Sequence, residues 1–135
     1  MVQRQLQIVV LSSLGLVAFP HVADACDCGR DPRPARLTSS DVIFVGRVVQ
    51  SQPLAFVELE VRETFNGKLD SQVWIATGQS DCDYFLPPVV APRGSEFLLY
   101  GTIRDGKVLV SSCSDSGPVG RKIRELRQLR RPVKK

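Results

Sequence analysis

The chain has 135 residues, of which 43% are hydrophobic and 24% are charged. These fractions are those of an ordinary globular protein and argue against a disordered or a membrane protein, and the length allows one compact domain but not two. The formal net charge of +4 is unevenly spread, because residues 26–120 hold nine Lys and Arg against twelve Asp and Glu, whereas residues 121–135 hold eight against one. The basic character therefore belongs to the C-terminal segment.

Residues 1–25 have the features of a secretory signal peptide. A single arginine near the N-terminus is followed by an apolar stretch at residues 8–19, and Ala23 and Ala25 supply the small side chains that a signal peptidase recognises. The apolar stretch is shorter than the about 20 residues that a spanning helix needs. We expect cleavage after Ala25, a mature chain that begins at Cys26, and a secreted or periplasmic protein.

Lipid attachment at Cys26 is the competing route of processing, because this cysteine follows a small residue. Two neighbouring residues disfavour it: Ala23 stands where a larger aliphatic side chain is expected, and Asp24 is unusual beside such a site. Acylation of Cys26 would also leave three cysteines to pair. A lipoprotein anchored at Cys26 is therefore the minor alternative.

The first part of the mature chain predicts an arm followed by a strand. Residues 27–40 are rich in Pro, Arg and Ser, which is typical of an extended arm, with one helical turn near Leu37. Residues 42–49 are mostly β-branched and predict a buried strand, in which Gly46 marks a bulge or a tight bend.

Residues 55–65 predict a second strand, because apolar and charged side chains alternate roughly along it. Asn66-Gly67 is the strongest turn signal in the sequence, and residues 72–77 predict a third strand. Glu58 and Glu60 fall on the expected solvent face of the second strand, where solvation is their simplest role. The apolar set opposed to them is Phe56, Val57, Leu59, Val61 and Phe65.

Residues 82–94 contain three prolines and predict a loop. The apolar residues 97–103 and 108–112 predict a hairpin, with Asp105-Gly106 as its turn.

The last segment changes to a helical period. Pro118 suits a first helical turn, and Ser116 or Gly117 could cap it. Five strands and a C-terminal helix predict a mainly β fold, a small and partly open barrel, rather than a sandwich, which needs about seven strands. The residues on the expected apolar face of the helix are Val119, Ile123, Leu126 and Leu129.

Missing residue types argue against an enzyme. The only histidine, His21, lies in the signal peptide, so the mature chain lacks the usual general base, the Ser–His and Cys–His nucleophile pairs, and the commonest zinc ligand. There is no Gly-rich phosphate loop after a strand. Carboxylates are plentiful, but nothing favours a hydrolase built on a carboxylate pair. We expect a protein that is not an enzyme and holds no cofactor.

The four cysteines, Cys26, Cys28, Cys82 and Cys113, predict structural disulfides, because an exported short chain with an even cysteine count usually forms a disulfide framework. A zinc site would need paired ligands such as C-x₂-C, and a C-x-C redox centre would need an activating environment that the sequence does not show. A bond between Cys26 and Cys28 would close a cramped ring. Both remaining pairings join the C-x-C arm to Cys82 and Cys113.

The cysteines and several strand motifs occur together in a distinctive order. The residues are Cys26-Asp27-Cys28, Ser40-Asp41-Val42-Ile43-Phe44-Val45-Gly46, Phe65-Asn66-Gly67-Lys68, Thr77-Gly78, Cys82, Phe97-Leu98-Leu99-Tyr100-Gly101 and Cys113. The cysteine order and the C-x-C are the specific features of this pattern, since the strand motifs alone are weak. The pattern resembles the tissue inhibitors of metalloproteinases, and more closely the short bacterial proteins that match only their N-terminal domain; it spans Cys26 to about Leu129.

The resemblance implies an OB-type five-stranded barrel, which we place at residues 26–130, and the charge distribution indicates a basic tail at residues 131–135. It also implies which of the two open pairings is formed: Cys26 with Cys82, and Cys28 with Cys113.

The resemblance further implies that Cys26-Asp27-Cys28 contacts a protease. In the animal inhibitors the α-amino nitrogen and carbonyl oxygen of the first cysteine, here Cys26, chelate the catalytic zinc, and the side chain of the second residue, here Asp27, enters the specificity pocket. A neutral amine beside a carbonyl can replace the zinc-bound water in a five-membered chelate. Asp27 departs from the family, because an apolar pocket receives a carboxylate poorly.

The alternative is a secreted OB-fold binding module without inhibitory activity, since such barrels also bind sugars and nucleic acids. Its ligand would be an anionic polymer or another cell-surface ligand. The basic residues could attach such a module, or the inhibitor, weakly to an anionic surface; a solvated helix face with a frayed end is the alternative role, and the sequence favours neither. We expect a monomer. The cationic residues are Arg121, Lys122, Arg124, Arg127, Arg130, Arg131, Lys134 and Lys135.

Overall fold

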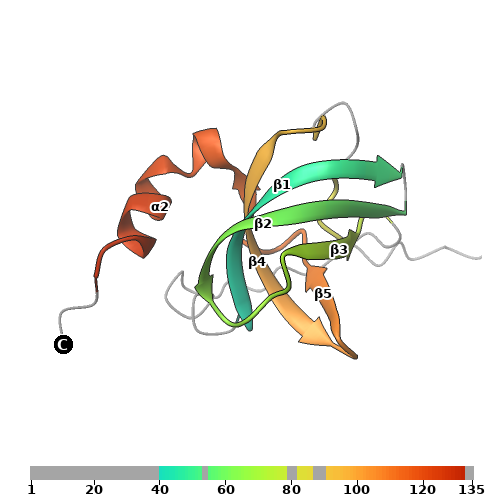
Figure 1. Ribbon diagram of the computed structural model, residues 1–135, viewed down its shortest axis with the longest axis horizontal. Coiled ribbons are helices and arrows are strands. Elements are labelled where there is room, and N and C mark those ends of the chain that lie inside the picture. Colours follow the sequence, from blue (N-terminus) through green and yellow to red (C-terminus); the bar gives the residue numbers. More distant parts are fainter. Residues whose placement is uncertain (1–39, 53–54, 79–81, 87–90, 133–135) are drawn as a thin grey trace, which may run out of the picture.

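The computed structural model describes residues 40–52, 55–78, 82–86 and 91–132 (Figure 1). Within these residues the chain forms six strands, a 3₁₀ turn and one α-helix. In chain order they are β1 (Val42–Gln52), β2 (Phe56–Asn66), β3 (Gln72–Ala76), β4 (Glu96–Arg104), β5 (Lys107–Val110), β6 (Gly117–Pro118), η1 (Val119–Arg121) and α2 (Ile123–Leu129).

Five of the strands close into a barrel, which confirms the predicted mainly β, OB-fold-like architecture. The strand order is β1-β2-β3-β5-β4, and β1 also pairs with β4, so the sheet returns on itself and the barrel is closed rather than partly open. The β3–β5 pair is parallel, and the other pairs are antiparallel. Closure leaves none of these five strands with a fully unpaired edge.

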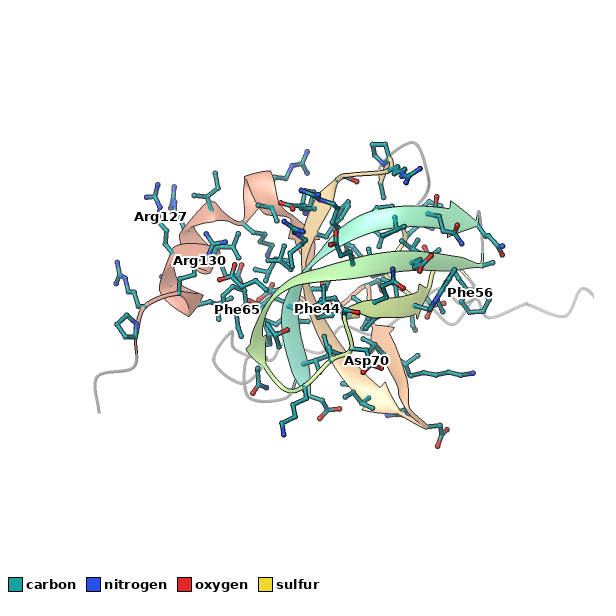
Figure 2. The ribbon with its side chains drawn as sticks, viewed as in Figure 1. Phe44, Phe56, Phe65, Asp70, Arg127 and Arg130 are labelled. Atoms are coloured by element: carbon teal, nitrogen blue, oxygen red, sulfur yellow. The ribbon has the colours of Figure 1, made fainter. Side chains whose placement is uncertain are left out.

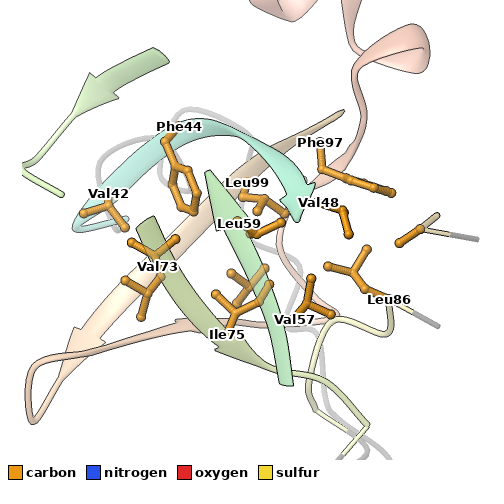
Figure 3. Close-up of a cluster of buried hydrophobic side chains, with 13 residues drawn as sticks. Val42, Phe44, Val48, Val57, Leu59, Val73, Ile75, Leu86, Phe97 and Leu99 are labelled. Carbon is orange, nitrogen blue, oxygen red and sulfur yellow. The ribbon is translucent and has the colours of Figure 1, made fainter. Parts of the chain in front are cut away.

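Strand β1 is buried on both faces, which explains why its first residues form a continuous apolar run. Val42 and Phe44 point into the barrel core, which Figure 3 shows. Ile43 and Val45 point the other way, into a second apolar cluster that contains Leu126 of α2. A helix covering the outside of the barrel therefore requires hydrophobic residues at successive positions of this strand.

Gly46 lies at the expected irregularity in β1. The register between β1 and β2 shifts between Val45 and Gly46. A Cβ atom at Gly46 would lie 3.1 Å from Leu59 Cδ1 and 3.2 Å from a ring carbon of Phe44, which is tighter than normal packing. The glycine thus allows the two strands to approach closely where the barrel bends, as the sequence predicted.

The two predicted turns differ in their outcome. Asp105 and Gly106 connect β4 to β5 directly, since Arg104 pairs with Lys107, and both turn residues have positive φ (51° and 73°). These are the signs of a two-residue type I′ hairpin, so this prediction is confirmed.

Asn66-Gly67 turns the chain but does not form a tight hairpin, because the pairing of β2 with β3 reaches only Glu60 and Gln72. The Asn66 side-chain amide instead donates a hydrogen bond to the carbonyl oxygen of Ser40 (3.0 Å) and thereby ties the start of a wider loop to the beginning of β1.

The helix begins later than the sequence predicted. Gly117 and Pro118 pair with Leu98 and Phe97 as β6, so Pro118 does not lie in the first helical turn. Neither expected cap is used: α2 starts after Lys122, which makes no side-chain capping bond, and the Ser116 hydroxyl accepts a hydrogen bond from the Tyr100 amide (2.9 Å). Pairing with β4 therefore replaces helix formation at residues 116–118.

Two apolar residues were assigned to the wrong face. Ile123 is 49% exposed, whereas Leu126 is buried and Val119 and Leu129 pack against it. Phe56 is 43% exposed and Val57 is fully buried, because neighbouring residues of a strand point to opposite faces. Phe56 thus belongs to the outer face of the barrel, together with Glu58.

Candidate functional site

The barrel brings Cys82 and Cys113 together, although they are far apart in sequence. Residues 82–84 run antiparallel to the chain that leaves β5. The Tyr84 amide donates to the Val110 carbonyl (2.9 Å), and the Ser112 amide donates to the Cys82 carbonyl (2.8 Å). Asp83 forms an isolated β-bridge with Ser111 between these two bonds. Cys82 therefore lies beside the segment that ends at Cys113, and we call residues 82–84 and 110–113 the cysteine edge.

This arrangement meets the geometric requirement of a C-x-C arm. Two residues separated by one residue have Cα atoms at most about 7 Å apart. A disulfide joins Cα atoms about 4.4–6.8 Å apart. One C-x-C segment can therefore bond to two other cysteines only if the Cα atoms of those cysteines lie within about 20 Å of each other. The cysteine edge meets this limit easily, because Cys82 is hydrogen-bonded to Ser112, the neighbour of Cys113.

Neither described cysteine is a free thiol. Cys26, Asp27 and Cys28 lie outside the described residues, so the connectivity and the contact of this segment with a protease stay predictions.

Thr77 fixes the segment after Cys82 to the barrel. Its side chain is only 1% exposed, and its hydroxyl accepts a hydrogen bond from the Leu86 amide (2.8 Å) and lies 3.3 Å from the Tyr84 carbonyl, to which it donates. The Leu86 side chain is fully buried in the barrel core. The predicted loop at residues 82–94 is thus anchored at Tyr84 and Leu86, and between these anchors the Phe85 side chain is exposed.

Tyr84 of the cysteine edge lies close enough to Arg121, in the C-terminal region, for the charge of Arg121 to affect its ionisation. Partial burial raises the pKa of Tyr84, and the Arg121 guanidinium nearby opposes that rise.

In the part of the chain that the structure describes, no group of three or more His, Cys, Asp or Glu side chains is placed to hold a metal ion. No helix among these residues has the length and apolar character needed to cross a membrane.

The basic C-terminal residues fall into two groups. Arg130 forms a two-pronged ion pair with Glu63 of β2, with Nη2–Oε2 at 2.7 Å and Nε–Oε1 at 3.1 Å. Lys122 lies 3.1 Å from Glu125, which in turn accepts a hydrogen bond from the Tyr100 hydroxyl. Arg130 therefore ties the helix to the barrel, whereas Lys122 pairs within the helical segment, with the carboxylate that Tyr100 of β4 also contacts.

The remaining described cations face solvent. Arg121, Arg124, Arg127 and Arg131 are exposed and form none of the ion pairs found among the described residues. We call these four residues the arginine face; Figure 2 shows Arg127 on α2 pointing outward. Lys134 and Lys135 lie outside the described residues.

The sequence assigned Thr77 no role beyond its place in the Thr77-Gly78 motif, and it did not single out Trp74. Thr77 was placed at the end of a strand, and its buried hydroxyl depends on where the loop returns, which no local pattern records. Trp74 could have been found, because it alternates with the apolar residues Val73 and Ile75 and must therefore lie on the outer face.

No protein-family model matches the chain, and a comparison with curated proteins gives no match either.

Proposed function

We propose that this protein is a secreted inhibitor of zinc metalloproteases, similar to the tissue inhibitors of metalloproteinases. In this proposal Cys26-Asp27-Cys28 is the protease-contacting segment. The observation that carries the proposal is the adjacency of Cys82 and Cys113, since the Ser112 amide donates to the Cys82 carbonyl at 2.8 Å. A barrel with this edge can hold a C-x-C arm at both of its cysteines. The proposed bonds are Cys26–Cys82 and Cys28–Cys113.

The inhibitor acts through backbone atoms of Cys26. After export and removal of residues 1–25, Cys26 carries a free α-amino group whose nitrogen and carbonyl oxygen chelate the zinc of the partner protease in place of its bound water. An α-amino group has a pKa near 7.7–8.0, and only its neutral form donates a lone pair. Binding to the protease should therefore weaken as the pH falls below that range.

The rigid anchors reduce the entropic cost of this binding. Each disulfide restrains one cysteine of the arm, and backbone hydrogen bonds fix the edge that carries their partners. Because the arm is ordered before the protease arrives, less conformational entropy is lost on association. This role needs no catalytic group, and the proposed protein is a monomer and not an enzyme.

Asp27 sets the class of target in this proposal. Its carboxylate would enter the specificity pocket, where an apolar wall would leave the charge without a partner. The targets are therefore zinc proteases whose pocket is polar or basic, and Asp27→Leu should shift inhibition towards proteases with apolar pockets.

A panel of secreted zinc proteases, assayed with the mature protein that begins at Cys26, tests the proposal. Inhibition of at least one protease is expected, together with an intact mass that starts at Cys26 and is lighter by four hydrogens than the reduced chain. A lipid on Cys26, or no inhibition across the panel, would contradict it.

The arginine face favours a second candidate, attachment to an anionic surface, with or without inhibition. Arg121, Arg124, Arg127 and Arg131 are exposed, whereas Arg130 and Lys122 are held in ion pairs. Electrostatic attraction of this kind is weak and is screened by salt. Binding to heparin or to anionic vesicles at low salt, lost at high salt, is the expected result.

A further inference from the structure

The outer face of β2, β3 and β5 carries an exposed apolar patch that the proposed functions do not use. Trp74 is 46% exposed, Phe56 43% and Leu109 38%. Phe56 pairs with Ala76, and Glu58 pairs with Trp74, so the two aromatic residues are diagonal neighbours on one face. Diagonal neighbours have Cα atoms about 7–8 Å apart, which lets large side chains form one continuous surface.

The parallel pairing of β3 with β5 extends this surface. Ile75 pairs with Val108, and both point into the barrel, so the alternate residues Trp74 and Leu109 lie on the outer face of neighbouring strands. We call Phe56, Trp74 and Leu109 the aromatic patch.

Polar side chains of both signs border the aromatic patch. Glu58 stands directly opposite Trp74, and Gln72 precedes it by two residues on the same face of β3. Lys107 is two residues before Leu109 on β5 and balances the charge of Glu58. The face therefore combines an exposed apolar surface with hydrogen-bonding groups, and the charges of Glu58 and Lys107 cancel.

The charge distribution indicates the kind of ligand. A polyanion would be attracted to the arginine face, and Figure 2 shows Arg127 and Phe56 on opposite sides of the molecule. A stable interface with a second copy buries about 800 Å² on each partner, far more than three half-exposed side chains supply. An uncharged ligand with an apolar face and polar edges fits these properties.

We propose that the aromatic patch binds a neutral polysaccharide. A sugar ring presents C–H groups on its face and hydroxyl groups at its edge. The C–H groups match the electron-rich faces of Trp74 and Phe56, and the hydroxyl groups match the polar side chains beside them. OB barrels use the corresponding strands for oligosaccharides, so the architecture is compatible with this use. The site is separate from the cysteine edge and does not depend on protease inhibition.

Trp74 is the only tryptophan of the chain, so its fluorescence reports on this patch alone. The mature protein is titrated with two neutral polysaccharides, hydroxyethyl cellulose and soluble starch, and with heparin as a polyanion. At least one neutral polysaccharide should shift the Trp74 emission to shorter wavelength and protect it from acrylamide quenching. Heparin should leave the emission unchanged even where it binds.

Variants then locate the site by affinity gel electrophoresis in the same polysaccharides. Phe56→Ala and Trp74→Ala should each weaken retardation by at least about tenfold in affinity, because a stacked ring loses one aromatic partner. Ile123→Ala removes a side chain of similar exposure (49%) on α2 and should bind as the unaltered protein does. All three positions are exposed, and far-UV circular dichroism checks that the variants remain folded.

Several results would overturn the proposal. They are the absence of binding to both neutral polysaccharides, binding that leaves Trp74 emission unchanged, undiminished binding by Trp74→Ala, and a response of Trp74 to heparin only. A blue shift that grows with protein concentration in the absence of sugar would show instead that a second copy covers the patch.

Discussion

The cysteine edge and the helix α2 are both attached to the barrel, but by different forces. Backbone hydrogen bonds fix the cysteine edge, whose two cysteines are not free thiols, and a buried threonine hydroxyl secures the segment that follows. Side chains fix α2: Leu126 packs in the second apolar cluster, Tyr100 donates to Glu125, and Arg130 pairs with Glu63. The first kind of attachment is insensitive to pH and salt, whereas the second responds to both. A surface that presents a rigid wedge needs the first kind.

The largest effect is expected when a disulfide of the cysteine edge is removed. Cys113→Ser should lower the free energy of unfolding by about 2–5 kcal/mol, because the unfolded chain gains freedom when a long loop is opened. The measurement is urea unfolding of the oxidised mature protein.

Combining Cys113→Ser with a second serine substitution tests which cysteines are joined by disulfide bonds. If Cys28 pairs with Cys113, the double variant Cys28→Ser with Cys113→Ser should be no less stable than Cys113→Ser alone, and it should release no free thiol. Recovery of a Cys26–Cys113 peptide from the unaltered protein would show the opposite pairing.

Thr77→Val should cause the next largest loss. The Leu86 amide would keep its buried position and lose its acceptor, which costs about 1–3 kcal/mol. Urea unfolding measures this loss, and Thr102→Val, on an exposed position of β4, serves as the matched control. Equal stabilities of the two variants would mean that the hydroxyl does not secure the segment.

On the helix side, Tyr100 should make stability depend on alkaline pH. Burial first, and then the hydrogen bond and negative charge of Glu125, raise the pKa of Tyr100 in the folded protein. Its contribution is complete below the unfolded pKa of about 10, and it is lost as the pH rises above that value, because the unfolded state then releases the proton more readily. Tyr100→Phe should flatten this dependence between pH 9 and pH 11 in thermal unfolding. A profile identical to that of the unaltered protein would contradict the assignment.

The smallest effects separate the two groups of arginines. Arg130→Gln removes a solvent-exposed ion pair and should lower thermal stability slightly, in a manner that disappears at high salt, without changing heparin binding. Arg127→Gln should do the reverse, since it weakens low-salt heparin binding and leaves stability unchanged. If both variants bind heparin equally to the unaltered protein, the arginine face is only a solvated surface.

The sequence predicted the parts of this molecule that depend on local chemistry. The Asp105-Gly106 turn and the irregularity at Gly46 follow from the residues themselves. The alternation of inward-facing and outward-facing side chains along β2 was also predicted correctly, except at Phe56. What depends on distant partners was missed: Pro118 has every local property of a first helical turn, yet β4 recruits it as a strand. Likewise, the spacing of the cysteines favours disulfides, but only the barrel shows that Cys82 and Cys113 are neighbours.

The central claim is that the free amine of Cys26 is presented to a protease zinc, and one added residue tests it. A mature protein with an extra alanine before Cys26 keeps all four cysteines and the barrel, but its Cys26 nitrogen becomes an amide that cannot chelate zinc. Inhibition constants of the two forms are compared on a sensitive zinc protease. The account predicts that the extended form loses inhibition while its thermal unfolding is unchanged; equal inhibition by both forms would contradict chelation by Cys26.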